Sequence, residues 1–152
     1  MSYPLYLFVF DIETVPDTEA ASNLTGCESQ NIIEQRKALT DYHLELTDGK
    51  NDFLRQPFHK VVALSYALFS IEYENRFESY NLKYLRSGGS DKEVDEKELI
   101  QGFFTVIEKY LPRIVTFNGR TFDIPVLKYR AMKYGISCSS FYDRAKGIDY
   151  QY

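Results

Sequence analysis

The feature that most constrains this chain is an apolar run that leads directly into two acidic residues. Residues 7–17 read LFVFDIETVPD. The run from Pro4 to Phe10 predicts a central strand buried on both faces. Asp11 and Glu13 follow it two positions apart, so on an extended chain both side chains point to one face. Two carboxylates this close usually share a proton or a cation, and an oxygen-rich site suits Mg²⁺ or Mn²⁺. Two solvated acids at a strand–loop junction would show the same pattern.

A second stretch, residues 116–132, reads TFNGRTFDIPVLKYRAM and places an acid at the start of a helix. A short strand at 113–117 precedes an Asn-Gly turn, and Asp123 precedes Pro125, which is typical of a first helical turn. An acid here can simply cap the helix, because the helix dipole favours it. Since the acids of both stretches follow strands of one predicted sheet, we expect them to meet at the strand ends.

The remaining pattern predicts a single domain, residues 1–152, with a loop-rich insertion at about 14–59. Further predicted elements are a helix at 29–39, strands at 61–71 and 76–82, a flexible break at 87–90, and helices at 94–111 and 122–134. Three strands followed by alternating helix and strand predict an α/β mixed sheet flanked by helices.

Charge is distributed unevenly along the chain, although the net charge is −4. Residues 109–146 hold eight basic and two acidic residues, whereas residues 1–108 hold 10 basic and 19 acidic. A basic segment beside carboxylates suits a phosphate backbone, and an ordinary solvated surface would give the same counts. No segment is typical of a membrane span or a signal peptide, and Cys27 and Cys138 lack metal or redox spacing. These features predict no membrane association and a reducing, cytoplasmic location.

The two quoted stretches carry a resemblance to a known family. FDIETVPD resembles the first motif of the DEDD superfamily of 3′–5′ exonucleases, in which D-x-E supplies two metal ligands. FNGRTFDIPVL resembles the second motif in its family-B DNA polymerase proofreading form, N-x-x-x-F-D-x-P. Residues 58–67 and 97–104 are similar to connecting segments of predicted bacterial 3′–5′ exonucleases related to that polymerase domain. The resemblance implies a ribonuclease-H-like fold.

The resemblance also implies a two-metal site that hydrolyses phosphodiester bonds at 3′ ends of single-stranded DNA. Asp11 would bridge two Mg²⁺ or Mn²⁺ ions. Glu13 would hold the ion on the side of the attacking water, and Asp123 would support the second ion, directly or through water.

The same resemblance implies three substrate-binding residues. Thr14 would offer its backbone N–H to the terminal nucleotide, and Asn118 and Phe122 would contact the substrate strand, Phe122 by stacking or wedging. Lys128 and Arg130, on the following helix, would either contact phosphates or lie on the surface.

The family also needs a fourth carboxylate in a third motif, Y-x-x-x-D or H-x-x-x-x-D, whose Tyr or His acts on the water. No such motif follows Asp123, and HLELTD, with His43 and Asp48, fits only by coincidence and in the wrong order. We therefore expect a domain truncated at its C-terminus, without the last core strand and helix. Such a chain would bind metal weakly and cut DNA slowly or not at all.

Three alternatives stay open at this point. FDIETV superficially resembles the nucleophile motif of haloacid-dehalogenase-like phosphatases, but their flap and downstream Lys–acid pair cannot be placed here. An inactive ribonuclease-H-like domain would bind nucleic acid or a protein without cutting. An exoribonuclease would share every motif named, because the contact to a 2′-hydroxyl cannot be read from sequence.

Overall fold

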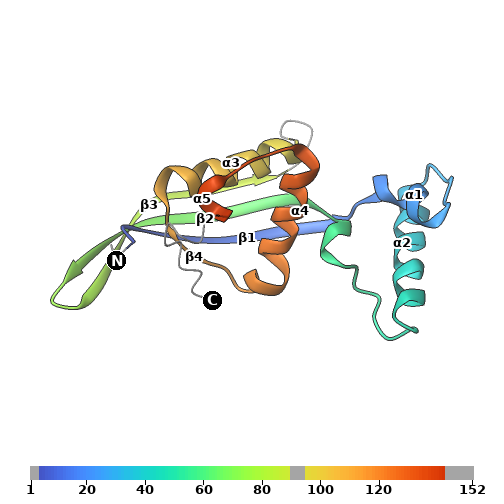
Figure 1. The fold of residues 1–152 in the computed structure, drawn as a ribbon, viewed down its shortest axis with the longest axis horizontal. Helices are drawn as coiled ribbons and strands as arrows, with labels where there is room; N and C mark the ends of the chain where they lie inside the picture. The colour runs from blue at the N-terminus through green and yellow to red at the C-terminus, as the bar shows by residue number, and fades with distance from the viewer. Residues whose placement is uncertain (1–3, 90–94, 143–152) are drawn as a thin grey trace. The chain divides into compact units, whose positions relative to one another are not determined.

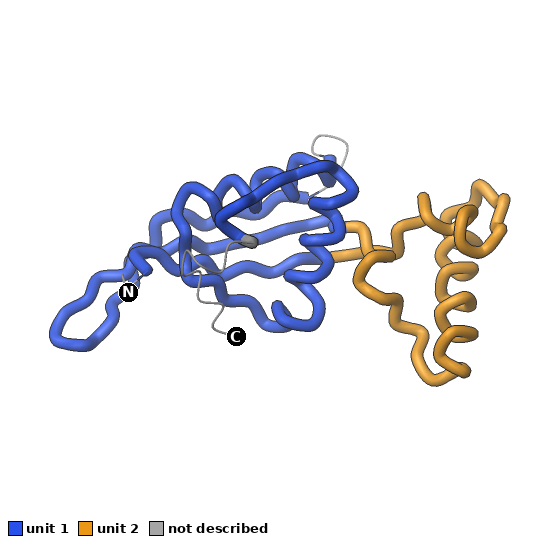
Figure 2. Tube along the Cα trace, viewed as in Figure 1, with its two compact units in different colours: residues 1–13, 61–152 blue, residues 14–60 orange. Residues whose placement is uncertain are grey.

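The computed structural model describes residues 4–89 and 95–142 of the chain. These residues divide into two compact units, of which one runs up to Glu13 and again from Val61, and the other covers residues 14–60 (Figure 2). The assignment of the whole chain to one domain with an insertion stays a prediction.

The larger unit is built on a four-stranded mixed sheet in the order β3-β2-β1-β4 (Figure 1). The strands are β1 (Tyr6–Pro16), β2 (His59–Glu74), β3 (Phe77–Gly89) and β4 (Arg113–Val115). β1 pairs with β4 in parallel, whereas β2 pairs with β3 in an antiparallel hairpin. This α/β arrangement confirms the predicted fold class and is consistent with the ribonuclease-H-like fold.

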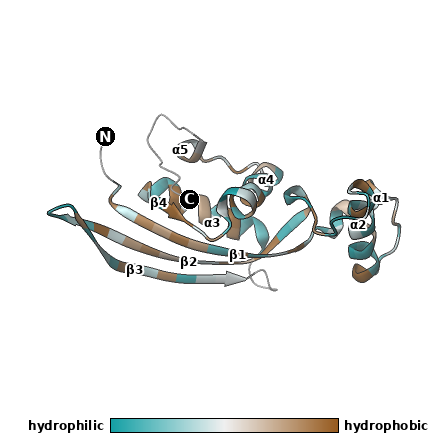
Figure 3. Ribbon diagram, turned by 90° about the horizontal axis from the view of Figure 1, so that it is seen from below, coloured by the Kyte–Doolittle hydropathy of each residue, from teal (hydrophilic) through white to brown (hydrophobic). Residues whose placement is uncertain are grey.

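Helices cover one face of this sheet (Figures 1 and 3). They are α3 (Glu96–Tyr110), α4 (Ile124–Tyr134) and α5 (Ser139–Tyr142). The rings of Phe8 and Phe10 in β1 lie 5.6 and 4.9 Å from the ring of Phe103 in α3. Leu7 and Val9, on the other face of β1, are half-buried. The central place of this strand is confirmed, but its predicted burial on both faces is wrong among the described residues.

Two strands run further than the sequence pattern predicts. β1 continues past Asp11 and Glu13 to Pro16. The composition predicts that the strand ends before the acids, but hydrogen bonds to neighbouring strands of the sheet keep the segment extended. β3 continues to Gly89, so residues 87–89, predicted as a flexible break, pair with β2. The hydroxyls of Ser65 and Ser87 share a 2.8 Å hydrogen bond there. Ser90 and Val94, at the edges of the predicted break and helix, lie outside the described residues.

The smaller unit is mostly helical. It holds the 3₁₀ turns η1 (Thr18–Ala20) and η2 (Gln56–Phe58) and the helices α1 (Ala21–Thr25) and α2 (Ile32–Leu46). The helix predicted at 29–39 begins at Ile32, where the Asn31 side chain accepts a 2.9 Å hydrogen bond from the N–H of Ile33. Ala21, Leu39 and Leu54 form a small core of this unit. Across both units, none of the described helices has the length and apolar character that crossing a membrane requires.

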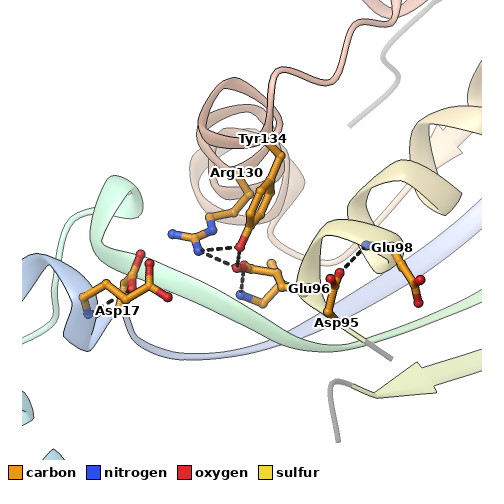
Figure 4. Close-up of polar contacts among 8 residues, drawn as sticks. Asp17, Asp95, Glu96, Glu98, Arg130 and Tyr134 are labelled. Carbon is orange, nitrogen blue, oxygen red and sulfur yellow. Dashed lines mark hydrogen bonds and ion pairs between the residues drawn. The ribbon is translucent and has the colours of Figure 1, made fainter. Parts of the chain in front are cut away.

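A buried polar network ties α3, α4 and β2 together (Figure 4). Glu96, at the start of α3, accepts hydrogen bonds from the N–H of Val61 at 2.6 Å and the hydroxyl of Tyr134 at 2.6 Å. Its carboxylate also pairs with the guanidinium of Arg130 on α4. Both side chains of this ion pair are 2% exposed. The network therefore fixes α4, the helix that follows the second motif, against the sheet.

Removing one partner of this pair should destabilise the fold strongly, because a buried charge is left uncompensated. We expect Arg130→Met to lower the free energy of unfolding by about 3 kcal/mol or more, measured by urea denaturation. The Glu96→Gln/Arg130→Met double variant should recover part of that loss. Arg113→Met is the matched control, since the Arg113–Glu78 pair is more exposed, and its loss should be about 1 kcal/mol. Equal losses in both single variants would contradict the assigned role.

Candidate active site

Asp11 and Glu13 lie within β1, on its exposed face. Burial alternates along this strand, with Phe10 and Ile12 in the core and the two acids outside it. Val9, two positions before Asp11, pairs with Val115 of β4. Because paired residues of a sheet point to the same side, the face that carries the acids continues onto β4.

Asp123 is positioned by the segment that follows β4. The chain passes through one π-helical turn, η3 (Gly119–Asp123), before α4 begins, a geometry that is frequent at functional sites. The N–H groups of Phe122 and Asp123 donate to the Asn118 carbonyl at 2.9 and 3.3 Å. Asp123 stands at the N-cap position of α4, but its side chain makes no capping hydrogen bond and is 3% exposed. Helix capping therefore does not account for this acid.

Thr116 and Gly119 hold the Asp123 carboxylate in place. The Thr116 hydroxyl donates a hydrogen bond to Oδ2 of Asp123. A Cβ atom added to Gly119 would lie 2.1 Å from Cγ2 of Thr116, far inside contact distance. Only glycine lets the turn approach Thr116 this closely, so both residues support the geometry of the acid.

The electrostatics of Asp123 link it to Asp11. Burial raises the pKa of the Asp123 carboxyl, the hydrogen bond from Thr116 opposes that rise, and the negative charge of Asp11 raises the pKa further. The two acids stand 112 positions apart in the sequence, so it is the fold that lets the charge of Asp11 act on Asp123. A divalent cation would offset both the cost of burying a charged carboxylate and the repulsion between the two negative charges. These carboxylates therefore fit a hard metal ion.

Glu13 does not complete a tight ligand cluster with them. Within residues 4–89 and 95–142, no three His, Cys, Asp or Glu side chains gather closely enough to hold a metal ion. The negative charge of Asp11 thus raises the pKa of Asp123, whereas Glu13 lies two positions after Asp11 on β1.

The three predicted substrate-binding residues have different surroundings. Asn118 is exposed, and its side-chain oxygen accepts a hydrogen bond from Thr121. Phe122 is half-buried and packs against the main core. Thr14 belongs to the smaller unit, where its hydroxyl lies 3.0 Å from Nδ1 of the buried His59.

The two cations considered for phosphate contact also differ. Arg130 is 2% exposed and pairs with Glu96, so the prediction of a surface or phosphate-contacting residue is wrong. Lys128 is half-buried, with its ammonium 5.5 Å from the centre of the Phe141 ring.

Sequence reasoning missed the parts played by Thr116 and Gly119. A hydroxyl residue directly after a strand and a glycine three positions later are common in turns, and the pattern offers no sign that the two touch. Only their contact, and the bond from Thr116 to Asp123, distinguishes them from ordinary turn residues.

Comparison with known proteins assigns the family. A family model described as a predicted 3′–5′ exonuclease related to the exonuclease domain of PolB matches residues 51–151. The chain belongs to this family. The matched exonuclease region contains Asn118, Phe122 and Asp123, whereas the acids of β1 lie before it.

A curated relative agrees with this exonuclease family. DNA polymerase 1 of Sulfurisphaera ohwakuensis is 58% identical over 38 residues, which are 25% of this chain and 4% of the polymerase. The chain thus matches a small fraction of that polymerase. No solved structure matches the chain.

Replacing Asp123 by its neutral isostere should stabilise the protein in the absence of metal. Because the pKa of Asp123 is raised in the folded state, its contribution is present below its ordinary pKa and lost as the pH rises through the raised value. Asp123→Asn keeps an acceptor for Thr116, so we expect a higher melting temperature at pH 7, by about 2 °C or more. The gain should shrink towards pH 3. Asp48→Asn, at an exposed acid, should show no such pH dependence, and a fall in stability of Asp123→Asn at pH 7 would refute the assignment.

Adding a methyl group at Gly119 should disturb the turn, since the new Cβ would collide with Thr116. We expect Gly119→Ala to lower the free energy of unfolding by about 1–3 kcal/mol. Gly102→Ala, where the new Cβ meets nothing within 4 Å, should instead stabilise α3 by about 0.5–1 kcal/mol.

A second-site change tests the mechanism of this clash. Thr116→Ser removes Cγ2, the atom that collides, and keeps the hydroxyl. The Gly119→Ala/Thr116→Ser double variant should therefore be more stable than Gly119→Ala alone in thermal unfolding. A double variant that is less stable would show that the clash lies elsewhere.

Proposed function

We propose that this chain is a 3′–5′ exonuclease domain that hydrolyses phosphodiester bonds at the 3′ end of single-stranded DNA. One observation carries the proposal: β4, which leads to the buried Asp123 held by Thr116, pairs in parallel with β1, the strand that carries Asp11. Membership of a family of predicted 3′–5′ exonucleases supports the same reaction.

Asp11, Glu13 and Asp123 are the proposed ligands of two Mg²⁺ or Mn²⁺ ions. When bound, such ions stabilise the charge on the attacking and leaving oxygens of an in-line displacement at phosphorus. Asp11 would serve both ions, Glu13 the ion on the side of the attacking water, and Asp123 the other. The positions of these acids, on β1 and at the end of the turn before α4, support the proposed roles.

Side chains and backbone groups of the chain itself would orient the acids and the substrate. The Thr116 hydroxyl fixes Oδ2 of Asp123 and so orients this carboxylate. Thr14, through its backbone N–H, Asn118 and Phe122 are proposed to contact the terminal nucleotides. The exposed side chain of Asn118 and the partial burial of Phe122 support these contacts, because a rigid, partly supported ring suits a wedge between bases.

One observation favours a second function, the binding of nucleic acid without hydrolysis. Among the described residues, Asp11 raises the pKa of Asp123, but no three-ligand cluster is present. A site with too few ligands would hold the strand and leave the phosphodiester intact.

A direct cleavage assay separates these functions. With a 5′-labelled single-stranded DNA and Mn²⁺ or Mg²⁺, we expect a ladder of products shortened from the 3′ end and none in EDTA. Asp11→Asn and Asp123→Asn should each lower the rate by about 100-fold or more, since each removes charge stabilisation at the reacting phosphate. Glu72→Gln, at an exposed acid elsewhere on the sheet, is the matched control and should keep the wild-type rate.

Each of the other outcomes of the assay would support another function or refute the proposed site. Binding with no cleavage at any Mn²⁺ concentration would support the second function. Faster cleavage of an RNA of the same sequence would identify an exoribonuclease. Equal rates in wild type and both acid variants would refute the proposed site.

A further inference from the structure

Phe117 is a phenylalanine whose side chain is entirely in solvent. Its relative exposure is 101%, whereas Phe8, Phe10 and Phe103 of the same unit are 4% exposed or less. Burying a phenyl ring is strongly favourable, so full exposure of one in a folded sheet needs an explanation from its position.

The position of Phe117 is next to the candidate active site. It directly follows Thr116, whose hydroxyl binds the carboxylate of Asp123. Burial alternates here as it does in β1, because Ile114 is buried, Val115 exposed, Thr116 half-buried and Phe117 exposed. Thr116 thus turns towards Asp123 while Phe117 turns away from the core.

The sheet register places the strand that leads to Phe117 beside the strand that carries the acids. Val9 of β1 pairs with Val115 of β4 in parallel, and paired residues share a face. Asp11 stands two positions after Val9, and Phe117 two positions after Val115. β4 ends at Val115, and Phe117, two positions later, is exposed as Val115 and Asp11 are.

The neighbours of Phe117 suit a nucleic acid strand. Asn118 and Arg120 are both exposed, so an amide and a cation accompany the ring within four residues. Aromatic rings that stack with bases, together with cations that contact phosphates, are the usual means of holding single strands without sequence preference.

We propose that Phe117 is a stacking platform for a nucleobase of the single-stranded substrate beside the carboxylate site. This inference rests on the proposed exonuclease function and names a further substrate-binding residue for it. Phe122, half-buried against the core, offers part of its ring to the substrate, whereas Phe117 offers a whole ring.

The test measures binding of a fluorescent single-stranded oligonucleotide in Ca²⁺, with the length of the DNA checked on a gel afterwards. Base–aromatic stacking contributes about 1–3 kcal/mol, so Phe117→Ala should weaken binding about 5- to 150-fold. Phe117→Tyr should retain affinity, and Phe117→Leu, which keeps apolar volume without a ring, should lose it. The slope of affinity against salt concentration should not change, because no cation is removed.

Phe77→Ala is the matched control. Phe77 is 78% exposed but lies at the β2–β3 hairpin, beyond the start of β1 (Figure 1). Its removal should leave binding unchanged, and the melting temperatures of all variants should equal that of wild type, since neither ring packs in the core.

An abasic scan identifies the contact directly. A single abasic nucleotide moved along the DNA should weaken wild-type binding at one position near the 3′ end, and Phe117→Ala should be insensitive at that position. Wild-type binding with no loss in Phe117→Ala, or an equal loss in Phe77→Ala, would overturn this inference alone. Absence of DNA binding by the wild-type chain would overturn the proposed function and this inference with it.

Discussion

The site depends on the parallel pairing of β1 with β4. In a parallel pair the carboxyl ends of both strands lie at the same edge of the sheet. The residues that follow the two strands therefore lie near each other. β1 carries Asp11 just beyond its paired residues, and β4 leads within eight positions to Asp123. α3 joins β3 to β4, and its phenylalanine face packs in the core against β1 and β4.

The buried acid of the candidate site lowers the stability of the fold, and neighbouring contacts offset part of this loss. Asp123 is buried near a second negative charge, which is unfavourable without a cation. A hydroxyl from Thr116 and a turn that only Gly119 permits hold the acid in that position, and the Glu96–Arg130 pair fixes the helix that follows. A hydrogen bond from Thr116 and a buried ion pair on the following helix thus accompany the unfavourable burial of this acid.

Much of the sheet and its helices could be predicted from the sequence, because apolar periodicity reports burial. The helix at 94–111, the strand at 61–71 and the central strand ending in acids follow from period and composition alone. The lengths of β1 and β3 could not be predicted, since they depend on hydrogen-bonded neighbours distant in sequence. The burial of Arg130 could not be predicted for the same reason. An arginine on a helix is usually exposed, and its burial here depends on its partner Glu96, 34 positions earlier.

The two motifs differ in their support, because the family match includes the second motif and not the first. The family model covers residues 51–151 and so includes the turn with Asp123, but Asp11 and Glu13 precede it. What joins the acids of β1 to the exonuclease region is therefore physical: the parallel register of β1 with β4 and the effect of the Asp11 charge on the pKa of Asp123. An acid on a strand 112 positions earlier that raises the pKa of a buried acid in this way supports our proposal that Asp11 of LFVFDIETVPD belongs to the site.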